Sequence, residues 1–167
     1  MGYELELSYE PRFIADAMLG RLARWLRLLG FDTLYYQDIR DGDLLKLAVQ
    51  EDRFILTKDS HFSKIKGLKN LLIIHYDHSM EQVREVLMSF NIRESRPRRC
   101  PCCNGMLVPV HSKETVRDMV PEHVFFDCGN FQSCRTCGKV YWEGSHLKRL
   151  RERVDAFWGK DGCGERS

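Results

Sequence analysis

The stretch FIADAMLGRLARWLRLLGFDTLYY, residues 13–36, decides the predicted fold. It begins with a short apolar run at 13–15 that suits a buried strand. Over residues 18–29 the apolar side chains recur at the i, i+3/i+4, i+7 spacing of a helix, and Gly30 is well placed as its C-cap. The aromatic and β-branched residues 31–36 then predict a second strand. This order predicts two parallel strands joined by a right-handed crossover.

The same alternation continues through the first half of the chain. Residues 41–50 predict a helix with an acidic first turn. The bounded apolar runs at 54–57 and 71–74 are typical of buried parallel strands. The capping-box spacing S-x-x-Q that starts at Ser79 predicts a helix over 79–90. The expected fold class is therefore α/β with a parallel sheet.

Acidic side chains follow two of the predicted strands at their carboxyl ends. Asp16 directly follows the first strand, and Asp59 follows the strand at 54–57. Asp41 and Asp43 open the helix between them. Because ligands of a parallel sheet gather beyond the carboxyl ends of its strands, we expect these carboxylates to share one rim.

Carboxylates gathered at one rim predict a divalent cation, because they repel one another and a hard ion removes that cost. Mg²⁺ and Mn²⁺ favour oxygen ligands, and two such ions can generate hydroxide and stabilise the leaving oxygen in phosphodiester hydrolysis. Ordinary structural roles are an alternative for the same residues. Asp41 suits a helix N-cap, Asp43 suits the helix dipole and Asp59 suits a turn cap. Asp38 is a fifth candidate for the rim.

Two C-x-x-C pairs in the second half of the chain predict a metal centre. Cys100 and Cys103 form one pair, and Cys134 and Cys137 form the other. Together they offer four thiolates to one tetrahedral Zn²⁺. A filled shell leaves no open position, so we predict one structural zinc per chain that supplies folding energy to a small module.

Three further cysteines have no place in this tetrahedral site. Cys102 is expected to be a bystander, Cys128 a small buried apolar residue rather than a ligand, and Cys163 part of a polar tail. The N-terminus is acidic where a signal peptide would be basic and apolar, and no run of 18 or more apolar residues occurs. With an odd number of cysteines, these features predict a cytoplasmic protein without membrane segments.

A polar segment divides the chain into two predicted parts. Residues 91–99, NIRESRPRR, have no apolar period and are expected to form a hinge. We expect an α/β domain over 1–93, a zinc-ribbon module with a basic helix over 94–160, and a disordered tail over 161–167.

The formal charge is divided unevenly along the chain. Residues 1–90 carry 12 Lys/Arg and 14 Asp/Glu, net −2, and residues 91–167 carry 14 and 10, net +4. This balance permits nucleic-acid binding without demanding it. The candidate nucleic-acid contacts are Arg21, Arg24, Arg27, Trp142, Lys148, Arg149 and Arg151. Solvated helix faces explain the basic residues as well, and packing in the ribbon core explains Trp142.

Three stretches of the chain resemble the Mut7-C family of PIN-like RNase domains. They are FIADAMLGRLARWLRLLGFDT, DGDLLKLAVQEDRFILTKD and CRTCGKVYWEGSHLKR. The resemblance implies a PIN-like fold with three α/β/α layers over residues 1–93, followed by the zinc ribbon. It also implies a nuclease whose few acidic residues hold divalent metal.

The resemblance can be carried over residue by residue. Asp16 matches the first acidic position, Asp41 opens the D-x-x-L-L-x-x-A helix, and Asp59 is the aspartate of the T-x-D strand end. Asp43 is an extra ligand candidate. Related sequences continue as D-x-D-F where this chain has His61 before the phenylalanine, which leaves the number of metal ions open.

Taken together, these observations lead us to expect a metal-dependent ribonuclease, endonucleolytic in mode, that binds RNA with the help of its zinc ribbon. A non-catalytic RNA- or ribosome-binding protein with the same fold is the alternative, and cleavage that depends on Mg²⁺ or Mn²⁺ would separate the two. A thiol-based redox or metal sensor is a third class, which stoichiometric zinc under reducing conditions would exclude. The sequence gives no oligomeric state.

Overall fold

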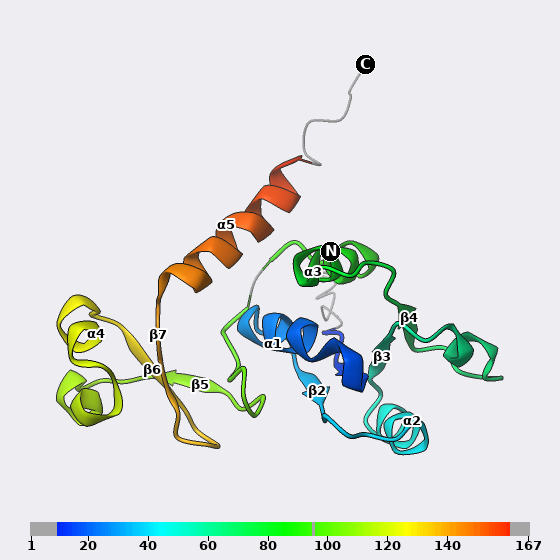
Figure 1. Cartoon of the computed structure of the whole chain (residues 1–167), viewed down its shortest axis with the longest axis horizontal. Coiled ribbons are helices and arrows are strands. Elements are labelled where there is room, and N and C mark those ends of the chain that lie inside the picture. Colours follow the sequence, from blue (N-terminus) through cyan, green and yellow to red (C-terminus); the bar gives the residue numbers. More distant parts are fainter. Residues whose placement is uncertain (1–9, 95, 161–167) are drawn as a thin grey trace, which may run out of the picture.

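Two sheets organise the chain (Figure 1). The computed structural model describes residues 10–94 and 96–160. The larger sheet has four parallel strands in the order β2-β1-β3-β4, namely β1 (Phe13–Ala15), β2 (Thr33–Tyr35), β3 (Phe54–Thr57) and β4 (Leu71–Ile73). The smaller sheet is antiparallel in the order β5-β6-β7, namely β5 (Leu107–Pro109), β6 (Phe131–Cys134) and β7 (Val140–Trp142).

Helices cover both faces of the parallel sheet. The α-helices are α1 (Gly20–Leu28), α2 (Asp41–Gln50), α3 (Ser79–Ser89), α4 (Glu122–Asp127) and α5 (Ser145–Lys160). Alternate residues of a strand point to opposite faces. Phe13 and Ala15 accordingly pack with α1 and α3, whereas Ile14 packs with Leu44 and Ala48 of α2. Helices on both faces of a parallel sheet confirm the predicted α/β fold class.

The predicted element boundaries need small corrections. The first helix begins as a 3-10 turn over Ala17–Leu19 and becomes α-helical at Gly20. Strands β2 and β4 are shorter than the apolar runs that predicted them. The capping box is wrong, because His78 is the N-cap of α3 and makes no side-chain cap bond. Gln82 instead turns inward and donates to two carbonyl groups of the preceding loop.

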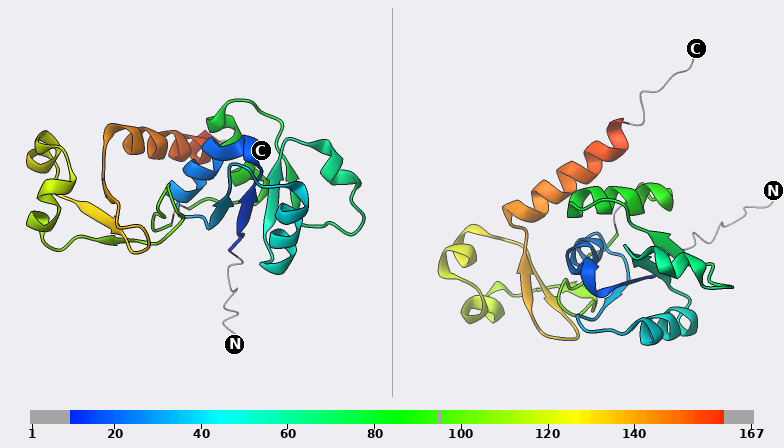
Figure 2. Two further views of the ribbon diagram at one scale, coloured as in Figure 1. Left: turned by 60° about the horizontal axis from the view of Figure 1, so that its bottom comes forward. Right: turned by 45° about the vertical axis from the view of Figure 1, so that its right-hand side comes forward.

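The chain after residue 94 is joined to the first part by several contacts. Leu147, Leu150 and Val154 of α5 are buried in the same core as the inner faces of α1 and α3. The helix that was expected to belong to the ribbon therefore covers the parallel-sheet part, as Figure 2 shows. The predicted tail at 161–167 lies outside the described residues. Within the described chain, no helix has the length and apolar character needed to cross a membrane.

The segment predicted as a hinge is fixed to the end of α1. The backbone N–H of Arg96 donates to the Leu29 carbonyl at 3.0 Å, and that of Arg99 donates to the Arg27 carbonyl at 2.8 Å. Gly30 allows this approach, because a Cβ atom on it would lie 2.6 Å from the Cβ of Arg96. Gly30 also has φ of 95°, a conformation that favours glycine.

Arg27 is a structural residue of this junction, which corrects its prediction as a nucleic-acid contact. Its side chain is only 5% exposed. The guanidinium donates to the carbonyls of Thr33 at 2.8 Å, Pro101 at 3.0 Å and Cys102 at 3.3 Å. An α-helix turns about 100° per residue, so a spacing of three drifts, and Arg27 lies about 120° around the helix from Arg21.

We expect Arg27→Met to lower the free energy of unfolding of the zinc-loaded protein by about 1–3 kcal/mol, because it leaves the buried Thr33 carbonyl and two partly buried carbonyls without this donor. Arg24→Met, on the exposed side of the same helix, is the matched control and should change stability by no more than about 0.5 kcal/mol. Urea denaturation measures both. Equal stability of the two variants would show that Arg27 does not hold the junction.

Candidate active site and zinc centre

Asp16 and Asp59 lie at the carboxyl ends of neighbouring parallel strands. Asp16 follows β1 and Asp59 follows β3, which pair with each other. The Thr57 hydroxyl joins the two positions, since it donates to Asp16 Oδ2 and accepts from the backbone N–H of Asp59 at 3.0 Å. Thr57 is fully buried, whereas the two hydrogen bonds of its hydroxyl are partly buried. Our sequence reasoning overlooked Thr57, although the T-x-D spacing contains it.

Both carboxylates also cap the turns that follow them. Asp16 Oδ1 accepts from the backbone N–H of Met18 at 2.8 Å, and Asp59 Oδ1 accepts from that of His61 at 2.8 Å. The His61 backbone and then its ring, whose Nδ1 lies 2.9 Å from Asp59 Oδ1, hold the pKa of Asp59 below its usual value. Asp59 is thus ionised at neutral pH.

Asp41 and Asp43 are exposed in the first turn of α2. Arg40 is the N-cap of this helix, so Asp41 does not cap it. A short connection, residues 36–40, joins the carboxyl end of β2 to α2, so this helix begins on the side of the sheet where Asp16 lies. Among the described residues, however, the aspartates do not form a group of three or more ligands close enough to share one ion.

The four predicted zinc ligands form one compact cluster. The Sγ atoms of Cys100, Cys103, Cys134 and Cys137 all lie within 4.8 Å of one another. Burial would raise the pKa of the Cys134 thiol, yet the backbone N–H groups of Cys137 and Thr136 lower it to about 6. Four sulfurs at these separations, one of them readily ionised, form a donor set that could hold one Zn²⁺.

Backbone geometry brings the first knuckle against the second. The Cys100 N–H donates to the Gly105 carbonyl at 2.7 Å, and the Asn104 N–H donates to the Cys100 carbonyl at 2.9 Å. A Cβ atom on Gly105 would lie 2.9 Å from Cys134 Sγ, so only glycine fits there without displacement.

The remaining described cysteines lie outside the four-sulfur cluster. Cys102 is exposed, and its sulfur accepts from Lys139 Nζ at 2.9 Å. Cys128 packs on the apolar cluster around Val124 and Phe131. Cys163 falls outside the described residues.

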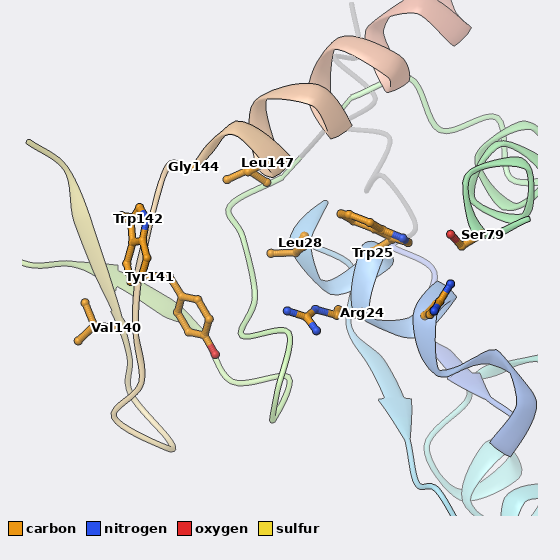
Figure 3. Close-up of a pocket in the computed structure, with 10 residues that line it drawn as sticks. Arg24, Trp25, Leu28, Ser79, Val140, Tyr141, Trp142, Gly144 and Leu147 are labelled. Atoms are coloured by element: carbon orange, nitrogen blue, oxygen red, sulfur yellow. The ribbon is translucent and has the colours of Figure 1, made fainter. Parts of the chain in front are cut away.

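The predicted RNA contacts fall into two groups. Arg21, Arg24 and Trp142 line a pocket of about 630 Å³ between α1 and β7 (Figure 3). Lys148 and Arg149 are exposed on α5, where Arg151 forms an ion pair with Glu143 at 2.7 Å.

Two aromatic residues of the pocket were absent from the predicted contacts. Trp25 and Tyr141 line it as well, and both are half-buried. Trp25 could have been predicted from the sequence, because it lies four residues after Arg21 and therefore on the same face of the helix. Tyr141 is placed by the zinc ribbon, because its hydroxyl lies 3.0 Å from Cys100 Sγ.

The Mut7-C RNAse domain family matches residues 11–154 of the chain. This range covers both sheets and most of α5, so the zinc ribbon falls within the matched region. Comparisons with curated proteins and with solved structures gave no match.

We expect the reduced protein to contain one zinc per chain, and Cys137→Ser to lose it, because a hydroxyl is a poor replacement for a thiolate ligand. Cys102→Ser is the matched control and should retain the metal, since Cys102 lies outside the cluster. Elemental analysis of purified protein measures this. A folded, reduced wild type without zinc, or loss of zinc from both variants alike, would contradict the assignment.

Proposed function

The chain belongs to the Mut7-C RNAse domain family, and from this premise we propose that it is a divalent-metal-dependent ribonuclease with its active site at Asp16 and Asp59. The observation that carries the proposal is the Thr57 hydroxyl, which joins the Asp16 carboxylate to the backbone N–H of Asp59 across two neighbouring strand ends. This hydroxyl holds the Asp16 side chain beside the turn that begins at Asp59, so the two carboxylates lie at adjacent strand ends.

The donor set at this rim fits a hard divalent cation. Asp16 and Asp59 each use oxygens to accept internal hydrogen bonds, yet a carboxylate has about four lone-pair sites, so both keep acceptor capacity toward the solvent. Mg²⁺ or Mn²⁺ would supply an activated water and stabilise the leaving oxygen of the phosphodiester.

The protein residues have separate roles in this proposal. Asp16 and Asp59 are the principal ligands, and Thr57 fixes Asp16 through the hydroxyl bond. Asp41 and Asp43 at the start of α2 would complete the site through water or the substrate phosphate, as is common for Mg²⁺. Because Asp59 is about half exposed, the rim is open to solvent, and we propose endonucleolytic cleavage within an RNA strand.

The zinc ribbon would hold the RNA beside this rim. Trp142 and the arginines of α1 line one pocket, and Lys148, Arg149 and Arg151 extend the basic surface along α5. Contacts of Lys and Arg with phosphate position a nucleic acid without reading its sequence. We further propose that the protein acts in the cytoplasm, where its thiols stay reduced.

We expect Asp16→Asn and Asp59→Asn each to remove most Mn²⁺-dependent cleavage of RNA, because a neutral amide binds a hard cation poorly. Asparagine can still accept the capping hydrogen bonds, so stability without added divalent ion should change by less than about 1 kcal/mol. Cleavage of a mixture of structured and single-stranded RNA, with and without Mn²⁺, measures activity, and thermal melting measures stability.

The exposed Asp118→Asn on the ribbon side is the matched control and should cleave as the wild type does. Mutants of Asp16 and Asp59 that melt earlier yet cleave normally would show that these carboxylates only hold structure. Cleavage that does not depend on the divalent ion would overturn the proposed chemistry.

A further inference from the structure

We propose that the pocket between α1 and β7 is a subsite for an unpaired base of single-stranded RNA, next to the acidic rim. This inference rests on the proposed ribonuclease function and deepens it by naming the form of RNA that the protein accepts. Three features of the pocket support the inference: its aromatic side chains, its positive charge, and a neighbouring pocket that begins directly after Asp16.

The pocket presents aromatic rings on two opposite walls. Trp25 lies on α1, whereas Tyr141 and Trp142 lie on β7 across the gap (Figure 3). All three side chains are half-buried. Trp25 packs partly on the core beneath α1, Tyr141 on the cysteine cluster, and Trp142 on the ribbon cluster around Phe131, as the packing alternative for Trp142 predicted; the rest of each residue lines the pocket. Aromatic rings held in this way are platforms on which nucleobases stack.

The charge of the pocket suits a polyanion. Arg21 and Arg24 are exposed at the edge of the pocket, and Figure 3 shows Arg24 reaching from α1 toward Tyr141. No acidic residue lines this pocket in the part of the chain that the structure describes. The arginines can therefore bind backbone phosphates while a base occupies the aromatic interior.

One face of α1 brings these groups together. With about 100° per residue, Arg21, Arg24, Trp25 and Leu28 fall within an arc of about 100° on the helix. The opposite wall is set by the zinc ribbon, since the Tyr141 hydroxyl rests 3.0 Å from Cys100 Sγ. The walls are thus fixed by separate elements before any ligand binds.

A second, polar pocket of about 730 Å³ lies beside this subsite, and its lining includes Asp77 and Glu81 as well as Arg153. It is lined by Ala17 and Met18, which directly follow Asp16, and it shares Arg21 and Ser79 with the aromatic pocket. The shared Arg21 would therefore guide an RNA strand, whose base lies among the aromatic rings, into the pocket that begins directly after Asp16.

The form of the RNA follows from the geometry of stacking. A base can enter between Trp25 and the rings of β7 only when it is unstacked and unpaired. Duplex RNA offers phosphates to Arg21 and Arg24 but keeps its bases inside the helix. The pocket therefore favours single strands, loops and ends over duplex.

The test measures binding of the full-length, zinc-loaded protein without added Mg²⁺ or Mn²⁺, so that cleavage does not interfere. The probes are a short fluorescent oligoadenylate, an abasic strand with the same number of phosphates, and a hairpin duplex. We expect oligoadenylate to bind at least about tenfold more tightly than the other two, and to quench the fluorescence of Trp25 and Trp142.

Trp25→Leu and Trp142→Leu should each weaken oligoadenylate binding about tenfold without changing its dependence on salt, since they remove a ring but no charge. Trp25→Phe should retain most of the affinity because it keeps a ring. Arg24→Gln should weaken binding and also flatten the salt dependence, because one phosphate contact fewer releases fewer counterions. Zinc content and circular dichroism report whether each variant is folded.

Phe126→Leu and Arg117→Gln are the matched controls, since both residues are exposed on the ribbon away from the pocket. They should bind as the wild type does. Equal affinity of the leucine variants and the wild type, or equal affinity for oligoadenylate and the abasic strand, would overturn the subsite.

Cleavage assays with Mn²⁺ separate this inference from the proposed function. Ring-dependent binding by a wild type that does not cleave would support the subsite and reject the nuclease. Cleavage that requires Asp16 but is unaffected by loss of both tryptophans would support the nuclease and reject the subsite.

Discussion

The buried guanidinium of Arg27 is the constraint on which the arrangement of the two sheets depends. It donates to Thr33 at the start of β2 and to Pro101 and Cys102 in the first cysteine knuckle. A charged donor that is removed from water must have its hydrogen bonds satisfied, so these carbonyls cannot move apart independently. The ribbon is thereby oriented against the end of α1, and β7 comes to face the helix side that carries Arg24 and Trp25.

A second set of polar contacts continues this junction into the sheet. Asn104 of the knuckle accepts from the Thr33 N–H at 3.1 Å and donates to Asp32 at 2.7 Å, and Asp32 pairs with Arg53 at 2.7 Å. Burial would raise the pKa of Asp32, but the hydrogen bonds from Arg53 and Asn104 lower it overall. The charged carboxylate is therefore the form that holds the knuckle, and its contribution to stability is lost only as the pH falls through this lowered pKa.

Local pattern predicted the elements of this fold better than their packing. The apolar runs at 54–57 and 71–74 predicted strands correctly because both faces of a parallel sheet are covered. The two C-x-x-C pairs predicted the sulfur cluster because knuckle geometry is local. Arg27 was wrongly predicted as a nucleic-acid contact, because residues spaced by three do not stay on one helix face but move progressively around the helix. The packing of α5 on the core of the parallel-sheet part and the bond between Thr57 and Asp16 could not be predicted in this way. Both depend on residues far apart in sequence, which leave no periodic pattern.

The four-cysteine cluster also affects the proposed RNA site, because it contacts a residue that lines the pocket. Cys100 begins the knuckle that Arg27 and Asn104 hold, and its sulfur also meets the hydroxyl of Tyr141 on β7. The same cysteine cluster therefore joins the ribbon to the parallel-sheet part and fixes the position of Tyr141 in the pocket wall. In a chain without bound metal, four thiols in contact would have no common partner, and this wall would lose its support. A Zn²⁺ bound by the four cysteines would thus also preorganise the proposed pocket, which lowers the free-energy cost of ordering this wall when a base binds.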